Sequence, residues 1–411
     1  MNTRFAPSPT GKLHLANIKI ALLNYNAAKM YKKNFILRID DTDTKRSNNH
    51  QIEEIKELLK NLNINYDKSY QQSNKDYTVW INHLKNTGIL YPCYETEAEL
   101  IQQRTIQNKQ RLPVRYFPYI RDTSRAPHWR FKLDNTHIES WNDKIFGIQK
   151  HKLSEASDPV VIREDGTLLY ILASVIDDIE DKISIIIRGA DHIANTAIQR
   201  YMWRCLDYDP DQITFAHIPL MLDQDSKPFS KRNEADSVEK LLTEGYFPAI
   251  IRSSLLIPGY SDASPKDWRQ FDPFKYSKAN TKWSGCEKLQ KQYLLSLSEA
   301  EGLKWLHQKW PTATINHWNY LKHDLLLPIE IIKWRDIMES IEIYFPIQDA
   351  LDKEIRKLQL INPEIVAQKL DISISIASKK LRYILTGNES GPATDLFQLM
   401  PEKVLQRRFK C

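Results

Sequence analysis

The chain has 411 residues, of which 42% are hydrophobic and 27% charged, so we expect a folded protein of roughly two to four domains and not a disordered chain. It contains no run of about eighteen apolar residues and no charged-then-apolar leader, which disfavours both a membrane span and secretion. The net charge of +6 is small. The four cysteines occur singly, without the paired spacing of a zinc site or of a disulfide framework, which favours a reducing cytoplasm.

The beginning of the chain alternates predicted strands and helices. Residues 4–7 read as a short strand that runs into a proline-rich turn, after which apolar residues recur at helical spacing. Residues 34–39 form a second apolar strand, followed by an acidic turn and an amphipathic helix over 52–62. This order predicts a parallel sheet with helices on its faces and ligands at the carboxyl ends of the strands, just beyond which His14 and Asp40 lie.

Positive charge is concentrated in residues 101–152, which hold eleven Lys and Arg against four Asp and Glu, a net charge of +7. Six aromatic residues are interleaved with them: Tyr116, Phe117, Tyr119, Trp129, Phe131 and Trp141. Basic and aromatic side chains together suit a surface that neutralises phosphates and stacks bases. A solvated basic face over an aromatic core is the alternative.

The strand pattern resumes after this basic stretch. Residues 183–188 read as a strand buried on both faces and residues 213–220 as a further strand, with a helix over 194–206 between them. The basic stretch is therefore an insertion between two halves of one nucleotide-binding type of sheet. From residue 237 the periodicity is mostly helical, and from about residue 316 the chain reads as all-helical. Prolines mark the loops of this last part: Pro328, Pro346 and Pro363.

Several short motifs follow one another along the chain. The first two are Arg-Phe-Ala-Pro-Ser-Pro-Thr-Gly-Lys-Leu-His at 4–14 and Arg-Ile-Asp-Asp-Thr-Asp-Thr-Lys-Arg-Ser at 38–47. Four more lie at 172–178, 187–192, 228–232 and 385–392: Leu-Ala-Ser-Val-Ile-Asp-Asp, Ile-Arg-Gly-Ala-Asp-His, Pro-Phe-Ser-Lys-Arg and Leu-Thr-Gly-Asn-Glu-Ser-Gly-Pro. Together they resemble the glutamyl-tRNA synthetases of bacterial type, a family of class I aminoacyl-tRNA synthetases, over nearly the whole chain.

The resemblance implies an α/β fold: a Rossmann-like parallel-sheet catalytic domain with an inserted acceptor-binding domain, followed by a mostly α-helical C-terminal region. Five segments are expected in chain order. They are the first half of the catalytic domain (1–95), the inserted basic acceptor-stem-binding domain (96–168), the second half of the catalytic domain with the Ser-Lys-Arg loop (169–236), a helical stem-contact region (237–315) and a compact α-helical anticodon-binding domain (316–411).

The resemblance also implies the reaction, which is the ATP-dependent attachment of L-glutamate to tRNA through a glutamyl-adenylate, with Mg2+ accompanying the ATP. The sequence offers no acid–base pair or nucleophile at suggestive spacing. In the family none is needed, because the attack on the α-phosphate of ATP is promoted by positioning the reactants and by stabilising the charge on the phosphates. The implied partners are L-glutamate and the tRNA for glutamate, bound by a cytoplasmic monomer without membrane contact. Whether the tRNA for glutamine is also a substrate stays open.

Two residues of the resemblance are expected to be catalytic. His14 matches the first residue of the His-Ile-Gly-His-type signature, and Lys231 matches the second lysine of the Lys-Met-Ser-Lys-Ser-type loop, whose ammonium suits the charge of a phosphate transition state. The ATP-binding set implied by these two signatures is His14, Asn17, Lys227, Ser230, Lys231 and Arg232.

Selection of glutamate requires a buried cation for the side-chain carboxylate, and an arginine fork is its natural partner. Arg4 on the first strand matches the family residue in that role, and Arg188 at the end of a later strand resembles a second contributor. The remaining implied contacts are Tyr170 as a hydroxyl donor, Ser8 and Asp40 near the amino-acid backbone groups, and Ser174.

In the family, the insertion grips the acceptor end of tRNA, which gives the basic stretch a role in phosphate neutralisation. The expected tRNA-binding residues are Arg104, Arg111, Arg115, Arg121, Arg125 and Arg130. Some relatives bind zinc in this insertion through clustered cysteines. Because Cys93 is alone there in the sequence, we expect no structural zinc and no other metal site.

The chain departs from the family pattern at a few signature positions. Ala16 stands where the family has a glycine that admits adenine, and Pro228 replaces the first loop lysine, with Lys227 displaced by one residue. Asp40 and Ser174 stand where Glu and Asn are common. A catalytically impaired paralogue that binds tRNA without adenylation is therefore the alternative function. The glutaminyl enzymes have a different first turn, and the glutamyl-queuosine tRNA synthetases lack the C-terminal helical domain, so both are disfavoured.

Overall fold

The computed structural model describes residues 2–43, 47–111, 116, 124–223, 225–227, 229, 237–264, 267–340, 342–343 and 345–410. The chain divides into two compact units. The first comprises Met1–Lys240 and Ile251–Ser284, and the second comprises Leu241–Ile250 and Gly285–Cys411. The division into five functional segments stays a prediction. No helix of the described residues is both long and apolar enough to cross a bilayer.

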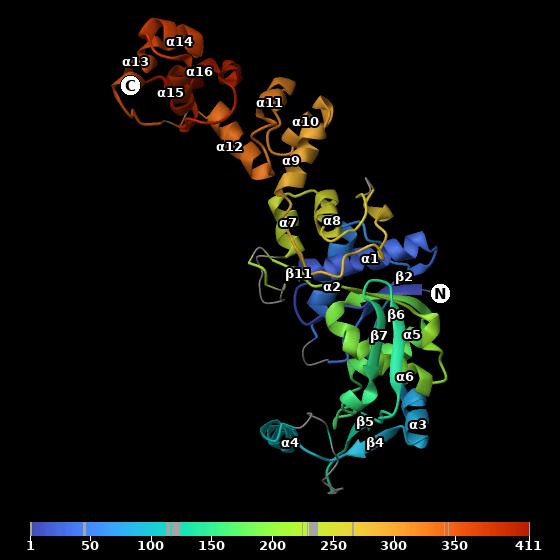
Figure 1. The fold of residues 1–411 in the computed structure, drawn as a ribbon. Coiled ribbons are helices and arrows are strands. Elements are labelled where there is room, and N and C mark those ends of the chain that lie inside the picture. The colour runs from blue at the N-terminus through green and yellow to red at the C-terminus, as the bar shows by residue number, and fades with distance from the viewer. Residues whose placement is uncertain are drawn as a thin grey trace. The chain divides into compact units, whose positions relative to one another are not determined.

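The first unit is built on a parallel sheet of five strands in the order β10-β9-β1-β2-β3, which confirms the predicted α/β fold (Figure 1). Its strands are β1 (Asn2–Phe5), β2 (Asn34–Ile39), β3 (Lys68–Gln71), β9 (Ile183–Gly189) and β10 (Thr214–Ile218). Helices α1 (Leu15–Met30) and α2 (Asn49–Asn61) lie on one face, and α5 (Tyr170–Glu180) and α6 (Ile193–Cys205) lie on the other (Figure 1). The predicted second strand has the observed bounds, whereas the first begins two residues earlier than predicted.

The order of the strands follows from the two directions in which the chain builds the sheet. From β1 it adds β2 and β3 on one side, and after the insertion it adds β9 and β10 on the other. The carboxyl ends of β1 and β9 therefore meet at a topological switch point, where open α/β sheets bind their ligands. Asn24 of α1 fixes this junction, because its side-chain amide accepts from the Thr3 hydroxyl (2.7 Å) and donates to the Ile187 carbonyl (2.9 Å).

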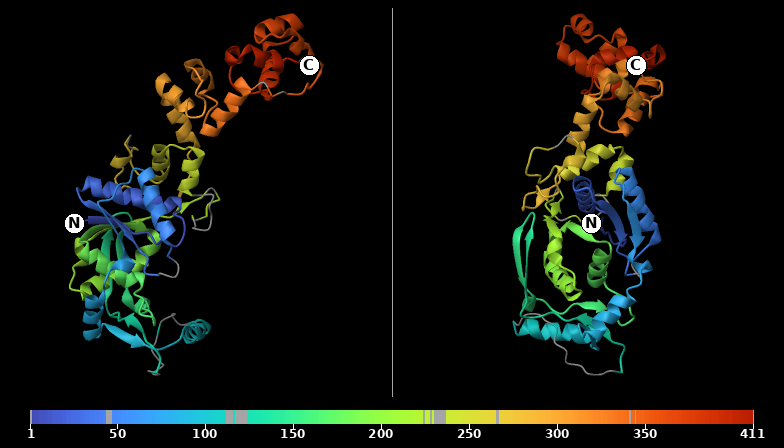
Figure 2. Two further views of the ribbon diagram at one scale, coloured as in Figure 1. Left: turned by 180° about the vertical axis from the view of Figure 1, so that it is seen from behind. Right: turned by 90° about the vertical axis from the view of Figure 1, so that its right-hand side faces the viewer.

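The insertion, together with the strand just before it, forms small antiparallel sheets. Strands β4 (Leu90–Cys93), β5 (His128–Phe131) and β8 (Val160–Ile162) form one sheet, and β6 (Ile138–Asp143) and β7 (Gly147–Lys152) form a hairpin. The hairpin lies along α6 (Figure 2), and Arg200 of α6 donates to Glu139 of β6 at 3.0 Å with both side chains buried. Helices α3 (Thr78–Asn86) and α4 (Glu97–Lys109) flank β4 in the sequence. The unit also contains the short pair β11 (Met221–Leu222) and β12 (Thr281–Lys282).

The second unit is helical, as predicted from the periodicity of the sequence. Two helices, α7 (Val238–Glu244) and α8 (Pro248–Leu256), have residues in both units. The others are α9 (Glu287–Ser296), α10 (Glu299–Leu306), α11 (Ile315–Leu321), α12 (Pro328–Glu339), α13 (Ala350–Leu358), α14 (Pro363–Leu370), α15 (Ile374–Thr386) and α16 (Glu402–Arg408). Pro328 and Pro363 begin helices, because proline at the first helical position loses no hydrogen bond.

Candidate active site

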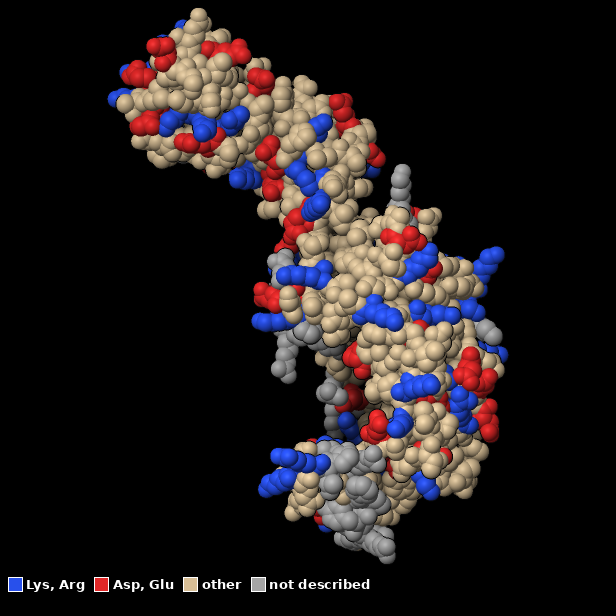
Figure 3. Space-filling view, viewed as in Figure 1, with Lys and Arg blue, Asp and Glu red and all other residues tan. Residues whose placement is uncertain are grey.

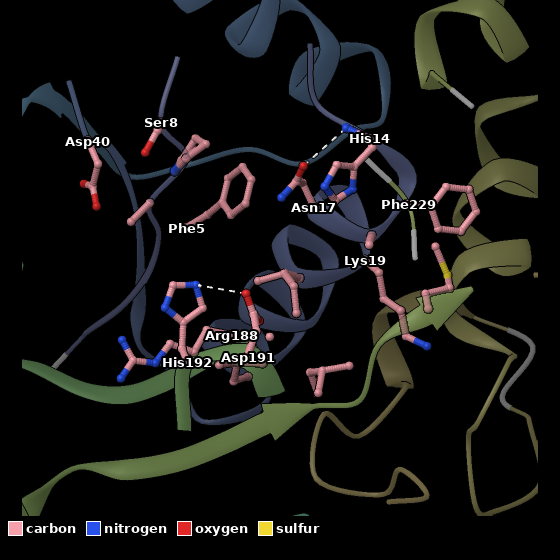
Figure 4. A pocket seen from close by; sticks show the side chains of 18 of the residues that line it. Phe5, Ser8, His14, Asn17, Lys19, Asp40, Arg188, Asp191, His192 and Phe229 are labelled. Carbon is pink, nitrogen blue, oxygen red and sulfur yellow. Dashed lines mark hydrogen bonds and ion pairs between the residues drawn. The ribbon is translucent and has the colours of Figure 1, made fainter. Parts of the chain in front are cut away.

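A cavity of about 450 Å3 opens at the carboxyl ends of β1, β2, β9 and β10 (Figure 4). Seven of the residues predicted for substrate binding line it: Arg4, Ser8, His14, Asn17, Asp40, Tyr170 and Arg188. These residues lie up to 184 positions apart in the chain, and the parallel topology brings them to one edge of the sheet. Ser8 and Asp40 lie on one side in Figure 4, and His14, Asn17 and Phe229 lie on another.

The His14 side of the cavity is formed by the N-terminus of α1. His14 is the residue before the helix, in an extended conformation, and its backbone N–H donates to the Asn17 side chain at 3.2 Å. Ala16, which replaces the family glycine, also lines the cavity. The helix begins directly at the cavity, so the N–H groups of its first turn and its positive dipole end suit phosphate oxygens.

Lys19, one turn further along α1, also lines the cavity and was not predicted from the sequence. Its side chain is 3% exposed and donates to the Pro258 carbonyl at 2.8 Å. Burial lowers the pKa of Lys19 to about 7. No sequence signal marked it, since a lysine on a helix is ordinarily exposed.

Part of the cavity wall is a buried cluster of opposite charges. Asp178 of α5 accepts from Arg4 Nε at 3.1 Å and from Arg38 Nη1 at 2.7 Å, and all three side chains are at most 6% exposed. Arg38 also donates from Nε to Asp40 at 2.8 Å. Burial raises the pKa of Asp40 to about 6 even beside the Arg38 guanidinium. Burial opposes ionisation of Asp178 too, but the two guanidiniums outweigh it and hold its pKa below the usual value.

Arg188 differs from Arg4 in its partners. Its guanidinium donates to Thr196 Oγ1 at 2.6 Å and to His217 Nε2 at 3.4 Å, and among the described residues it forms no ion pair with a carboxylate. The residue is 7% exposed, and burial lowers its pKa. A buried cation without a carboxylate is costly unless a ligand supplies the anion. Of the three arginines that line the cavity, Arg4 and Arg38 are therefore already paired with carboxylates, and Arg188 is not.

The other predicted substrate residues fall into two groups. Ser174 lies behind the cavity wall, where its hydroxyl donates to the Tyr170 carbonyl and accepts from Gln199, both at 2.8 Å. Lys227 is exposed in a turn closed by Asp223 and does not line the cavity. Ser230, Lys231 and Arg232 lie outside the described residues. Phe229, immediately before them, does line the cavity and packs edge-on against Trp283.

The residues predicted to bind tRNA are not all on the surface. Arg104 and Arg111 are exposed, and Figure 3 shows exposed Lys and Arg side chains at the position of α4. Arg125 is exposed as well and pairs with Glu99 at 2.9 Å. Arg130, by contrast, is 5% exposed, and its guanidinium stacks on Tyr116 and donates to the Asp158 carbonyl at 2.6 Å, so its part in binding tRNA stays a prediction. Arg115 and Arg121 lie outside the described residues.

Cys93 is not alone in the folded insertion, although it is in the sequence. Donor atoms of Cys93, Glu95 and His128 lie within 4.8 Å of one another, and all three residues are buried. They are three donors where structural zinc sites have four, and Glu95 already accepts from the Tyr116 hydroxyl at 2.8 Å. The expectation of no structural zinc stays a prediction.

Comparison with known proteins identifies the family. The profile described as tRNA synthetases class I (E and Q), catalytic domain, matches residues 1–296. The glutamate–tRNA ligase 1 of Ehrlichia chaffeensis is 34% identical over 98% of this chain and 96% of its own length. That of Zymomonas mobilis is 41% identical, over 64% of this chain and 61% of its own length.

Solved structures agree in fold. This chain superposes with a TM-score of 0.81 on the crystal structure of a glutamate tRNA ligase from Elizabethkingia meningosepticum in complex with its amino acid. The match covers 100% of this chain and 98% of that chain, at 24% sequence identity. The profile match includes both halves of the parallel sheet and every residue that lines the cavity. The chain therefore belongs to the class I tRNA synthetases of the glutamate and glutamine group.

Proposed function

We propose that this chain activates L-glutamate with ATP and transfers it to tRNA, as a glutamate–tRNA ligase. The observation that carries the proposal is the buried Arg188 guanidinium, which lines the cavity without a carboxylate partner among the described residues. An acidic side chain supplies the missing charge. The named activity of the Ehrlichia relative, which aligns over nearly its whole length, supports the same reaction.

The charges in the cavity match the two ends of glutamate. The side-chain carboxylate is held by Arg188 and Arg4, with the Tyr170 hydroxyl as a further donor, and the α-ammonium is held by Asp40 with Ser8 beside it. Glutamine has the same shape but no charge, so it would leave Arg188 buried and unpaired. Such a loss costs several kcal/mol, of the order of 3–5, which favours glutamate by a factor of 10² or more.

The phosphates of ATP are assigned to the N-terminus of α1. His14 and Asn17 lie there, and Phe229 brings the chain to the same cavity two residues before Lys231. Lys227, Ser230 and Arg232 belong to the same proposed loop, and Mg2+ supplies further positive charge on the phosphates when bound. An oxygen of the α-carboxylate of glutamate attacks the α-phosphorus of ATP, and pyrophosphate leaves. A ribose hydroxyl of tRNA then attacks the carbonyl carbon of the adenylate, and AMP leaves.

Transfer RNA is assigned to the basic surface of the insertion. Arg104, Arg111 and Arg125 are exposed there, and Arg115 and Arg121 belong to the same proposed surface. Binding through phosphates releases counterions, so we expect the affinity for tRNA to fall about tenfold or more between low and moderate salt. A flat salt response would argue against this surface. We propose that the enzyme acts as a cytoplasmic monomer. Side-by-side aminoacylation of the tRNAs for glutamate and glutamine would decide whether it charges both.

The impaired paralogue is the less favoured alternative. Ala16 narrows the cavity by one methyl group, and Pro228 removes a loop lysine. Both positions belong to the signatures that the resemblance assigns to ATP and not to glutamate, so both changes bear on the rate more than on the class of reaction.

Pyrophosphate exchange tests the proposal directly. Purified protein with tRNA should catalyse exchange between pyrophosphate and ATP with L-glutamate and not with L-glutamine. Arg188→Gln should raise the KM for glutamate at least 10²-fold, because the carboxylate loses its buried charge partner. Arg269→Gln, which removes an exposed arginine, is the matched control and should leave the KM unchanged. If no tested tRNA supports pyrophosphate exchange with glutamate, the proposed function is refuted.

A further inference from the structure

A continuous line of buried hydrogen bonds runs from the hairpin of the insertion to the cavity. Asp143, at the end of β6, binds the Nδ1 atom of His217 at 2.6 Å, and His217 lies in β10. The Nε2 atom of His217 lies 2.8 Å from Thr196 Oγ1 and 3.4 Å from Arg188 Nε. Neither the Asp143 nor the His217 side chain has exposed surface.

The donors around Asp143 fix the tautomer of His217. The backbone N–H groups of Ile145 and Phe146 donate to Oδ1 of Asp143 at 2.9 Å, and the His217 backbone N–H donates to Oδ2 at 3.2 Å. Burial opposes ionisation of this carboxyl, but the hydrogen bonds outweigh it and lower its pKa. Burial also lowers the pKa of His217 and favours the neutral ring. An ionised carboxylate accepts only, so Nδ1 carries the proton and Nε2 is an acceptor.

The acceptor at Nε2 faces the cavity arginine. Arg188 donates from Nε to His217 and from Nη2 to Thr196 Oγ1, so two groups of the planar guanidinium are held. Tyr170 is a further hydrogen-bond partner of this guanidinium, and the N–H groups that remain are left for a ligand of the cavity that Arg188 lines. The opposite tautomer of His217 would point an N–H at the guanidinium, which has no acceptor, and would displace it.

We propose that Asp143 and His217 form a positioning relay that orients Arg188 for the glutamate side chain. The proposal rests on the proposed function, because glutamate is the ligand that Arg188 would bind. Asp143 does not line the cavity, yet it sets the acceptor that holds the cavity arginine. The insertion thereby contributes to amino-acid selection through its hairpin, in addition to any contact with tRNA.

Two substitutions of His217 separate the relay from a merely structural role. Asparagine places its amide near the Nδ1 position, so His217→Asn keeps the contact with Asp143 and loses the acceptor for Arg188. Glutamine reaches the Nε2 position, so His217→Gln keeps an acceptor for Arg188 and weakens the contact with Asp143.

In pyrophosphate exchange, His217→Asn should raise the KM for glutamate about tenfold, as expected for losing one hydrogen bond to a charged group. The KM for ATP and kcat should stay within about twofold. His217→Gln should restore a KM within about threefold of wild type, even if its melting temperature is lower. His137→Asn removes another histidine–carboxylate contact near the same hairpin, to Glu139, and is the control expected to leave both KM values unchanged. If the KM for glutamate follows the melting temperature across these variants, the relay is refuted.

The tautomer provides a readout that does not depend on activity. In protein labelled with 15N-histidine, long-range proton–nitrogen correlation spectra should show His217 as the Nδ1–H tautomer, assigned by its absence in His217→Gln. Asp143→Asn presents an amide N–H to the ring and should shift the population toward Nε2–H, with the KM for glutamate raised. An Nε2–H or doubly protonated ring in the wild type at neutral pH would overturn the relay. Failure of wild-type exchange with glutamate would instead refute the proposed function, whichever tautomer is found.

Discussion

Replacing Asp178 by asparagine removes the carboxylate that two buried guanidiniums share. Asp178 contacts Arg4 at 3.1 Å and Arg38 at 2.7 Å, and the three side chains are 2%, 6% and 1% exposed. Removing one partner of a buried charge pair costs about 3–5 kcal/mol, because the remaining charge is left without compensation. Asparagine has the same shape, so the loss is electrostatic and leaves no cavity.

The chain offers a matched control in which the carboxylate shared by two arginines lies at the surface. Asp211 also bridges two arginines, Arg200 and Arg204, but its side chain is 60% exposed. Water screens such a pair, so Asp211→Asn should cost about 1 kcal/mol or less. The two variants differ in burial and not in the number of arginines bridged.

Native-state hydrogen exchange of peptides from β1 and β2 measures the effect locally, which suits a chain of two units. Asp178→Asn should lower protection there by roughly 10²- to 10³-fold or more, and Asp211→Asn should lower protection of its own surroundings by about tenfold or less. An Asp178 variant whose loss is no larger than that of the Asp211 variant would refute the claim that this cluster depends on burial.

Four further outcomes are expected. Because the pKa of Asp40 is raised to about 6, its carboxylate is protonated as the pH falls through that value, and the KM for glutamate should rise. Asp40→Asn should abolish this pH dependence. A wild-type KM that stays flat from pH 5 to about 7 would contradict the role of Asp40. Lys19 has a folded pKa of about 7 against 10.5 in the unfolded chain, so it destabilises the fold fully below about pH 7 and not at all above 10.5. Lys19→Met should therefore be more stable than wild type at pH 7, with the difference in thermal midpoint closing as pH rises; a constant difference would exclude the charge as its cause. In Gly302→Ala, the added methyl would lie 2.1 Å from the Trp318 ring, which should destabilise the second unit by about 1–3 kcal/mol in urea unfolding. Elemental analysis of chelator-treated protein should find less than about 0.1 zinc per chain without loss of structure, and a stoichiometric metal would show that Cys93 and its neighbours form a site.

The sequence by itself determined the class of fold and one edge of the sheet. Alternating strands and helices predict a parallel sheet. Residues at the end of a strand or directly after it, such as Arg188 and Asp40, must then meet at the carboxyl edge of that sheet. His14 could be assigned to the same edge for the same reason, because it ends the turn between a strand and a helix. These conclusions depend on local order along the chain.

Only the tertiary structure decided which charges are neutralised. Arg4 and Arg188 are both arginines on predicted strands, but Asp178 pairs with the first and not with the second. The same limit explains Arg130, which counts as a surface charge in the sequence and is buried against Tyr116. The residues that pair with such charges lie far away in the chain. The energy of a charge depends on its distance to these partners and on how far water is excluded, and the order of the residues specifies neither quantity.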